Sequence, residues 1–297
     1  MENSRGLNRP AITSLIRAAL REDRARHDIT SRVVLAADAS VRACLVAKAP
    51  GVVAGGPVAG WAFTVADPSV RYRQLVADGS RVRPGQTIAT VSGDARSIFA
   101  AERVALNLLG HLSGIASVTR TYVRRVRGTR AAIFDTRKTL PGLRRLEKYA
   151  VRVGGGRNHR MDLSDAILIK TNHLRALSHG PAAMNRAILQ AIHGARRAAG
   201  QRLVEIEVAN LREFKTALEA RPDAILLDNW RLADIRKAVA LRRGARRPRR
   251  GVPLLEVSGG ITLANVRAVA KTGVDRISIG RLTHSAPALE VALQVIA

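Results

Sequence analysis

Cysteine and long apolar runs are scarce in this 297-residue sequence. The single cysteine, Cys44, excludes an intrachain disulfide and a cysteine-rich metal site, and we expect it to be a small core residue. The longest uncharged stretch, residues 51–66, contains Pro57 and is shorter than the roughly 20 residues that a membrane-spanning helix needs. The first residues, MENSRGLNRP, lack the apolar core of a secretory signal. We therefore expect a cytoplasmic protein without disulfides or membrane spans.

Acidic and aromatic residues are also few. The chain has 50 Lys and Arg against 23 Asp and Glu, a net charge of +27, which implies anionic partners and makes nucleic acid a candidate. Only 3% of residues are aromatic and could stack on bases, and the cations are spread through every segment. The densest run, residues 242–250, lies between a predicted helix and a predicted strand, and we interpret it as a solvated loop. Nucleic-acid binding is therefore the weaker alternative, and we expect no specific nucleic-acid partner.

From about residue 131 onward, short apolar runs alternate with amphipathic helical patterns. This alternation is typical of βα units that form a parallel sheet or barrel. We predict strands at residues 131–134, 166–169, 203–208, 224–227, 253–257 and 276–280, and a weaker seventh strand at 159–163. Helical patterns fill the gaps, for example at 211–220 and at 262–273, where Thr262 is a candidate N-cap and Gly273 a candidate C-cap.

The first part of the chain follows a different pattern. An amphipathic helix at 11–23 precedes a strand at 41–49 and glycine-punctuated short strands at 78–94. A helical run at 98–126, which we expect to break near Ser113 and Gly114, joins this region to the predicted barrel. The sequence therefore predicts an α+β unit that is distinct from the barrel.

If the second part is a barrel, functional groups should project from the C-terminal ends of its strands. Nearly every predicted strand finishes in a polar or glycine-rich group. In chain order these groups are residues 135–138, Lys170, Glu205 with Glu207, Asp228 with Asn229, residues 258–260, and Gly280. The charged segment Asp-Thr-Arg-Lys at 135–138 is thus one of several polar groups at strand ends, which indicates that it borders a functional site.

The strand VEIEV at 204–208 is the most informative of these segments. Side chains alternate along a strand, so if the apolar residues face the helices, Glu205 and Glu207 point into the barrel, where unpaired charge is costly. Structural Arg or Lys partners would satisfy them. We favour the alternative in which Glu207, nearer the mouth, and Asp228 stabilise developing positive charge or hold Mg²⁺, because lysines also lie at strand ends.

Glycine-rich segments suggest where phosphate would bind. The segment EVSGGIT places Ser258, Gly259 and Gly260 between a strand and a helix, where backbone N–H groups and the helix N-terminus can receive phosphate. Gly280 follows the next strand, where barrels commonly complete a phosphate pocket. The segment GGGRNHR at 154–160 is weaker evidence, because glycines also serve tight turns. We therefore predict a phosphorylated ligand.

Seven segments in this order are similar to those of one known family. They are AERVALNLLGHLSGIAS, DTRKTLPGLRRLEKYAVRVGGGRNHRMDL, AILIKTNHL, VEIEV, LLDN, EVSGGIT and GVDRISIGRLTHSAPALE. They resemble the quinolinate phosphoribosyltransferase family of type II phosphoribosyltransferases, and the resemblance runs over nearly the whole chain. The resemblance implies an α/β fold with an N-terminal α/β sandwich domain at 1–113, an open seven-stranded α/β barrel at 114–282, and a tail at 283–297 that packs back on the first domain.

The resemblance also implies an activity. The family transfers the phosphoribosyl group of 5-phosphoribosyl-1-pyrophosphate to quinolinate with decarboxylation, a step of NAD biosynthesis that uses Mg²⁺ and no organic cofactor. It implies a homodimer with composite active sites, or a hexamer of dimers. A paralogue of the same fold associated with molybdenum transport keeps much of the DTRKT and GGG pattern and is the alternative. The segments RNHRM and ILIKTNH favour the quinolinate enzyme.

The resemblance assigns roles to individual residues of this sequence. The quinolinate site falls on Arg103, Arg137, Lys138, His159, Arg160 and Lys170, and the catalytic set on Lys138, Lys170, Glu207 and Asp228. The last two are also the ribose and Mg²⁺ carboxylates. The phosphate site falls on Ser258, Gly259, Gly260, Ser278 and Gly280, with His284 close by. Arg103 is implied to reach into the barrel mouth of a neighbouring subunit.

Three residues depart from the family pattern. Thr171 stands where the family usually has Asp, and Asp162 and His27 stand where Gly is usual. All three lie beside motif residues without replacing a charged ligand. We therefore expect them to change local loop shape rather than the reaction.

Overall fold

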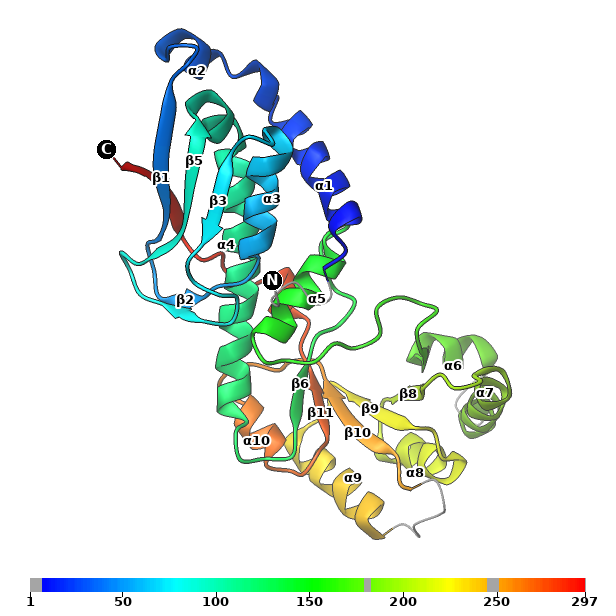
Figure 1. Cartoon of the computed structure of the whole chain (residues 1–297). Helices are drawn as coiled ribbons and strands as arrows, with labels where there is room; N and C mark the ends of the chain where they lie inside the picture. The colour runs from blue at the N-terminus through cyan, green and yellow to red at the C-terminus, as the bar shows by residue number, and fades with distance from the viewer. Residues whose placement is uncertain (1–6, 179–182, 245–250, 297) are drawn as a thin grey trace. The chain divides into compact units, whose positions relative to one another are not determined.

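Figure 1 shows the computed structural model of the chain, which describes residues 7–178, 183–244 and 251–296. The chain divides into two compact units. The first comprises Met1–Arg120, Lys138–Gly155 and Arg281–Ala297, and the second comprises Thr121–Arg137 and Gly156–Gly280. The domain boundary between residues 113 and 114 stays a prediction. No helix within the described ranges is long and apolar enough to cross a membrane.

A four-stranded antiparallel sheet forms the centre of the first unit. Its order is β12 (Val291–Ile296), β1 (Ser40–Ala47), β5 (Thr87–Asp94) and β3 (Arg71–Gln74). Helix α3 (Gly56–Ala66) packs against the sheet and against α1 (Arg9–Glu22), as Figure 1 shows. The predicted helix at 11–23 and strand at 41–49 are thus confirmed. Because β12 pairs with β1, the C-terminal segment returns to this unit.

The first unit also contains several short elements. These are η1 (Ala25–His27), α2 (Ile29–Val34), the paired strands β2 (Gly51–Val52) and β4 (Arg81–Val82), α5 (Arg144–Val153) and α11 (Arg281–His284). Cys44, on β1, is a free cysteine of intermediate exposure, so the expectation of a core residue is wrong.

Helix α4 (Ala95–Arg125) is continuous, so the predicted break near Ser113 and Gly114 is wrong. The small residues serve close packing instead. The Ser113 hydroxyl is fully buried and lies within hydrogen-bond distance of both the N–H and the carbonyl oxygen of Ala54, at 3.0 and 3.2 Å. A Cβ on Gly114 would lie 2.0 Å from the carbonyl oxygen of Pro287. A small pair inside a helical pattern marks a close contact here, and not a helix end.

The second unit is built on a six-stranded parallel sheet with helices between its strands. The strand order is β6 (Ala132–Phe134), β11 (Arg276–Ser278), β10 (Leu254–Ser258), β9 (Ala224–Asp228), β8 (Val204–Val208) and β7 (Ile167–Ile169). The helices are α6 (Thr171–Leu177), α7 (Met184–Ala198), α8 (Leu211–Ala220), α9 (Leu232–Gly244) and α10 (Val266–Ala270). The mixed α/β fold class and the six clear strands are confirmed.

The segment at 159–163, predicted as a weak seventh strand, is a loop. The nearest pairing is an isolated parallel bridge between Arg157 and Phe134. The buried carboxylate of Asp135 explains why pairing stops there. It accepts hydrogen bonds from the backbone N–H of His159 at 2.9 Å and from Nδ2 of Asn158 at 2.5 Å. A backbone donor that a strand would use is thereby taken by a side chain.

Two further predictions need correction. Arg242, placed in a solvated loop, belongs to α9, is 4% exposed and pairs with Asp275. Residues 245–250 of the same arginine run lie outside the described residues. The predicted helix at 262–273 is shorter, because α10 begins after Asn265 and not after Thr262. Gly273 has a φ of +96°, as a residue that follows a helix often does.

Candidate active site at the strand ends of the second unit

The parallel sheet of the second unit has an apolar face and a polar face. The alternation predicted for β8 is confirmed, because Val204, Ile206 and Val208 are all fully buried. Glu205 and Glu207 share the other face. The strand register extends that face across the sheet. Leu226 of β9 pairs with Glu207 on one side and with Glu256 on the other. Glu256 pairs in turn with Arg276, and Asp228 pairs with Ser258. Charged residues of four strands therefore lie on one face.

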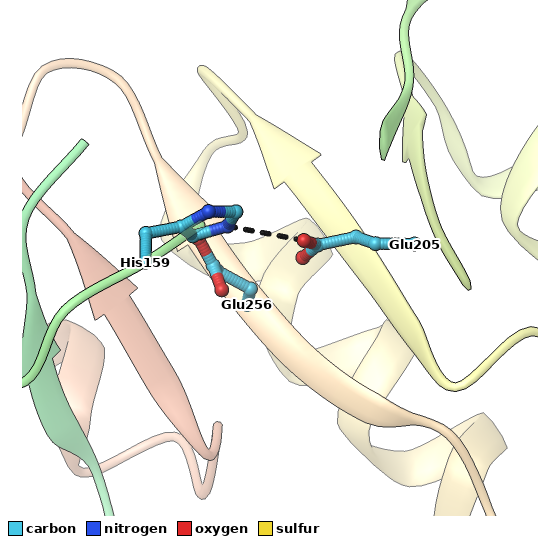
Figure 2. A group of neighbouring side chains, drawn as sticks. All are labelled: His159, Glu205 and Glu256. Carbon is cyan, nitrogen blue, oxygen red and sulfur yellow. Dashed lines mark hydrogen bonds and ion pairs between the residues drawn. The ribbon is translucent and has the colours of Figure 1, made fainter. Parts of the chain in front are cut away.

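Two of these side chains, Glu205 and Glu256, form a buried cluster with His159 from the loop before β7, as Figure 2 shows. His159 Nε2 lies 3.1 Å from Oε2 of Glu205 and 3.4 Å from Oε1 of Glu256. The two glutamates are 1% and 0% exposed. Arg276 adds a cation 3.8 Å from Glu256. The nearest partner of Glu205 is thus a histidine, and not one of the Arg or Lys residues considered from the sequence.

The cluster holds a proton. Burial disfavours the charged imidazole, but the hydrogen bonds and charges of Glu205 and Glu256 outweigh it and raise the pKa of His159 to about 9. Burial and the charge of Glu256 raise the pKa of Glu205 as well. The backbone N–H of Arg160 points at Nδ1 of His159 at 2.8 Å. Because the three groups titrate together, the extra proton belongs to the cluster as a whole.

The same contact argues against a metal ion in this cluster. One ligand atom from each residue lies within 4.8 Å of the others, a spacing that a metal ion could use. A metal on Nε2 would require the ring proton on Nδ1, where the N–H of Arg160 already points. We therefore interpret the cluster as a hydrogen-bonded group that balances the neighbouring arginines.

Glu207 and Asp228 lie at the ends of neighbouring strands, and both are half-buried. Glu207 Oε1 accepts a hydrogen bond from Oγ1 of Thr171 at 2.7 Å and another from its backbone N–H at 3.2 Å. Asp228 Oδ2 accepts from Nδ2 of Asn229 at 3.0 Å. Carboxylate oxygens are the ligands that Mg²⁺ prefers, so the chemistry of these two side chains is compatible with the predicted ion, which stays a prediction.

A cavity of about 220 Å³ lies where β9 and β10 end, lined in part by Asn229, Gly259, Gly260 and Asn265. Gly259 and Gly260 have φ values of +84° and +60°, which other residues rarely adopt. A Cβ on Gly259 would lie 2.2 Å from Oδ1 of Asn229, so the close approach also requires glycine. Because α10 begins only at Val266, a loop and not a helix N-terminus directly follows the glycines.

The other predicted site residues of the second unit lie at or after strand ends. Arg137 and Arg160 are half-buried in the segments after β6 and α5, and Lys170 is exposed at the end of β7. Burial and the nearby charge of Arg137 lower the pKa of Arg160, so the two guanidinium groups influence each other. Ser278 is buried on β11, and Gly280 follows it.

Three predicted site residues belong to the first unit. Arg103 is exposed on α4, and Lys138 is exposed after the segment that carries Asp135. His284 is exposed at the end of α11, with its Nδ1 2.7 Å from Oγ of Ser285. The backbone carbonyl of Lys138 accepts a hydrogen bond from Oγ1 of Thr283 at 2.6 Å.

Sequence reasoning missed Glu256 and Arg276. The signal was present, because Leu255 and Val257 face the buried side of β10, and alternation then places Glu256 on the polar face. The same argument on β11 places Arg276 opposite Ile277. The alternation applied to VEIEV would have identified both residues.

Comparison with known proteins decides the family. The model for the quinolinate phosphoribosyl transferase C-terminal domain matches residues 115–294, and the model for its N-terminal domain matches residues 28–113. The chain belongs to the quinolinate phosphoribosyl transferase family. The resemblance seen in the sequence is confirmed.

Individual members of this family are similar over nearly their whole length. The nicotinate-nucleotide pyrophosphorylase (carboxylating) of Mycobacterium leprae is 44% identical over 290 residues, which are 96% of this chain and 97% of that protein. A probable enzyme of the same name from Bacillus subtilis is 38% identical, with 97% and 95% covered. The solved nicotinate-nucleotide pyrophosphorylase of Francisella tularensis superposes with a TM-score of 0.87 at 36% identity, covering 98% of each chain.

Proposed function

We propose that this chain transfers the phosphoribosyl group of 5-phosphoribosyl-1-pyrophosphate to quinolinate, giving nicotinate mononucleotide, pyrophosphate and carbon dioxide. The observation that carries the proposal is the polar face of the parallel sheet, where Glu207 and Asp228 end neighbouring strands and the loop with Gly259 follows the next. Family membership and the names of the similar proteins support the same reaction. NAD biosynthesis is the corresponding pathway, and the cytoplasm the corresponding compartment.

Both substrates are polyanions, so cations supply much of the binding energy. Arg137, Arg160 and Lys170 bind the carboxylates of quinolinate beside His159. The resemblance adds Arg103 and Lys138 to this group. The phosphates of the second substrate bind at Ser258, Gly259, Gly260, Ser278 and Gly280, with His284 close by. An arginine fork suits a carboxylate because it donates two parallel hydrogen bonds.

In the transfer step, the ring nitrogen of quinolinate forms a bond to C1 of the ribose while the bond from C1 to pyrophosphate breaks. The pyrophosphate leaves with the bonding electron pair, and positive charge develops on the sugar. The carboxylates of Glu207 and Asp228 stabilise that charge. The cations Lys138 and Lys170 offset the charge of the leaving group. Glu207 and Asp228 would hold Mg²⁺, which when bound neutralises part of the charge on pyrophosphate.

Carbon dioxide is lost after transfer. The ring nitrogen is then cationic, and the bond from C2 to its carboxylate breaks with the electron pair left on C2. A proton from solvent completes the product. The ring itself stabilises the electron pair, so no organic cofactor is needed, and the site's task is to orient the ring and exclude water.

The direct test is an assay with purified protein, Mg²⁺ and both substrates. We expect one pyrophosphate and one carbon dioxide for each quinolinate consumed, with nicotinate mononucleotide identified by its mass. Omitting quinolinate should abolish pyrophosphate release. Pyrophosphate released at the same rate without quinolinate, or no product with both substrates present, would contradict the proposal.

We also propose a homodimer, or a hexamer of such dimers, in which Arg103 of one subunit completes the site of its partner. Arg103→Ala and Lys170→Ala should each be nearly inactive. A mixed dimer of the two variants contains one doubly damaged site and one intact site, so subunit exchange should restore activity. Size-exclusion chromatography of differently tagged chains establishes that mixed dimers formed. Mixed dimers as inactive as the separate variants would contradict a shared site.

A further inference from the structure

Thr171 makes both hydrogen bonds that fix the carboxylate of Glu207. Its Oγ1 and its backbone N–H donate to the same oxygen, Oε1, at 2.7 and 3.2 Å. Among the described residues, Glu207 has no other hydrogen bond or ion pair. One neighbouring residue therefore determines where this carboxylate points.

Because Thr171 lies at the start of helix α6, its hydrogen bonds to Glu207 cost no hydrogen bond within the helix. Thr171 is the first residue of α6, and the first N–H groups of a helix have no partner within the helix. The N–H of Thr171 can therefore serve Glu207 without giving up another bond, and the N–H of Lys170 is served by Nδ1 of His173 at 2.9 Å. The branched Cβ of threonine restricts its side-chain rotation, which helps to hold Oγ1 in place.

When one carboxylate oxygen of Glu207 is held by hydrogen bonds, the direction of the other oxygen is fixed as well. With Oε1 occupied by two donors, Oε2 of Glu207 can act as acceptor for a group at the strand ends. A carboxylate at position 171 would lie in contact with Glu207 and repel it unless a proton or cation came between them. The hydroxyl of Thr171 donates instead. This contact connects the departure at Thr171 to a predicted site residue, and not only to the shape of its own loop.

We propose that Thr171 is a positioning residue that orients Glu207 so that Oε2 faces the ribose during phosphoribosyl transfer. The inference rests on the proposed function, and it assigns Thr171 no contact with substrate. Its effect on catalysis passes through Glu207 alone.

The test compares Thr171→Val, which keeps the shape and removes the hydroxyl, with Thr171→Ser, which keeps the donor. Loss of one hydrogen bond to a charged group is expected to reduce kcat about 10-fold, with little change in the KM for quinolinate. Thr171→Ser should stay within about 3-fold of wild type, because the donor is retained. Thr272→Val is the matched control, since Thr272 Oγ1 donates only to the carbonyl of Val269, at 2.7 Å. It should retain wild-type kcat.

Two further measurements separate positioning from general structural damage. Calorimetric binding of nicotinate mononucleotide without divalent ion should weaken about 10-fold in Thr171→Val, because the product retains the ribose. In the Glu207→Gln background, Thr171→Val should change kcat less than about 2-fold, because residues acting through one group are not additive. Urea midpoints of all variants show whether they are folded.

The outcomes are distinct. A wild type that releases no pyrophosphate overturns the proposed function and the inference with it. An active wild type with an unaffected Thr171→Val overturns the inference alone. The inference is also overturned if Thr171→Ser is as impaired as Thr171→Val, or if the Val substitution has its full effect in the Glu207→Gln background.

Discussion

Two strands of this molecule end in a half-buried aspartate, one in each unit, and the two carboxylates have different tasks. Asp94 ends β5 of the antiparallel sheet, and its Oδ1 accepts the backbone N–H of Ser97 at 2.7 Å at the start of α4. Asp228 ends β9 of the parallel sheet and shares the polar face with Glu207 and Ser258. The first carboxylate completes a helix, whereas the second joins a set of charges from neighbouring strands.

The two sheets differ in the same way. In the first unit, buried residues of the sheet such as Ala43, Leu45 and Val91 are apolar. In the second unit, the polar face buries Glu205 and Glu256 completely. A domain gains nothing in stability from burying two like charges, which require compensation by His159 and Arg276. The buried charges, which stability does not require, therefore indicate that the parallel sheet of the second unit carries the function.

The effect that we expect to be largest separates the two aspartates. Asp228→Asn should lower kcat about 100- to 1,000-fold, because it removes a charge that acts when positive charge develops on the ribose. Glu207→Gln should behave in the same way, with quinolinate affinity nearly unchanged. Asp94→Asn should keep full activity and stability, since Asn caps a helix about as well as Asp. Steady-state kinetics with both substrates measure these changes. If Asp228→Asn and Glu207→Gln raised only the KM for quinolinate and left kcat unchanged, the roles of the two carboxylates would be wrong.

Cations of the site should affect binding more than turnover. Arg160→Ala and Lys138→Ala should each weaken quinolinate binding about 10- to 100-fold, because a carboxylate loses a charge-assisted hydrogen bond. Titration calorimetry with quinolinate measures the change. Arg73→Ala, on β3 of the first sheet, is the control and should bind normally. Unchanged affinity in the Arg160 and Lys138 variants would remove these residues from the site.

Two glycines with similar backbone angles, one in each unit, should respond differently to substitution. Gly259 and Gly85 have φ values of +84° and +82°, but a Cβ on Gly85 would meet nothing within 4 Å. Alanine at either position should cost about 1 kcal/mol in unfolding free energy. Only Gly259→Ala also displaces Asn229, so only this variant should raise the KM for 5-phosphoribosyl-1-pyrophosphate, by about 10-fold. Equal kinetics in the two variants would mean that the loop takes no part in binding phosphate.

The smallest expected effect is the change with pH in the contribution of His159 to the stability of the fold. The pKa of His159 is about 9 in the fold against 6.5 in the unfolded chain. Its contribution is therefore fully present below pH 6.5 and is lost as the pH rises through about 9. The difference in urea midpoint between wild type and His159→Asn should narrow over this range. Leu45→Ala, an apolar change in the first sheet, should cause the same loss at every pH, and a constant gap for His159→Asn would contradict the assignment.

Much of the structure of the second unit can be predicted from the sequence, because strand alternation and the βα pattern depend on residues close together in the chain. Alternation in VEIEV correctly separates Val204 and Ile206 from Glu205, and the βα pattern places all six strands. The motifs also predicted the family. These features depend on neighbours in the chain, which a single sequence contains.

The errors arise where a distant group decides the local structure. The carboxylate of Asp135 takes the donors of residues 158 and 159, so the expected seventh strand is a loop. Gly114 permits contact with Pro287 and does not end a helix. The bonds from Thr171 to Glu207 join segments 36 residues apart. None of these partners can be identified from spacing or periodicity.

We propose that the reaction takes place on the polar face of the second sheet. A crystal structure with nicotinate mononucleotide bound would test this placement. We predict the ribose within hydrogen-bond distance of Oε2 of Glu207, the phosphate at the loop containing Gly259, and the pyridine carboxylate at Arg160. Product bound away from this face, with Glu207 and Gly259 making no contact to it, would show that the reaction takes place elsewhere.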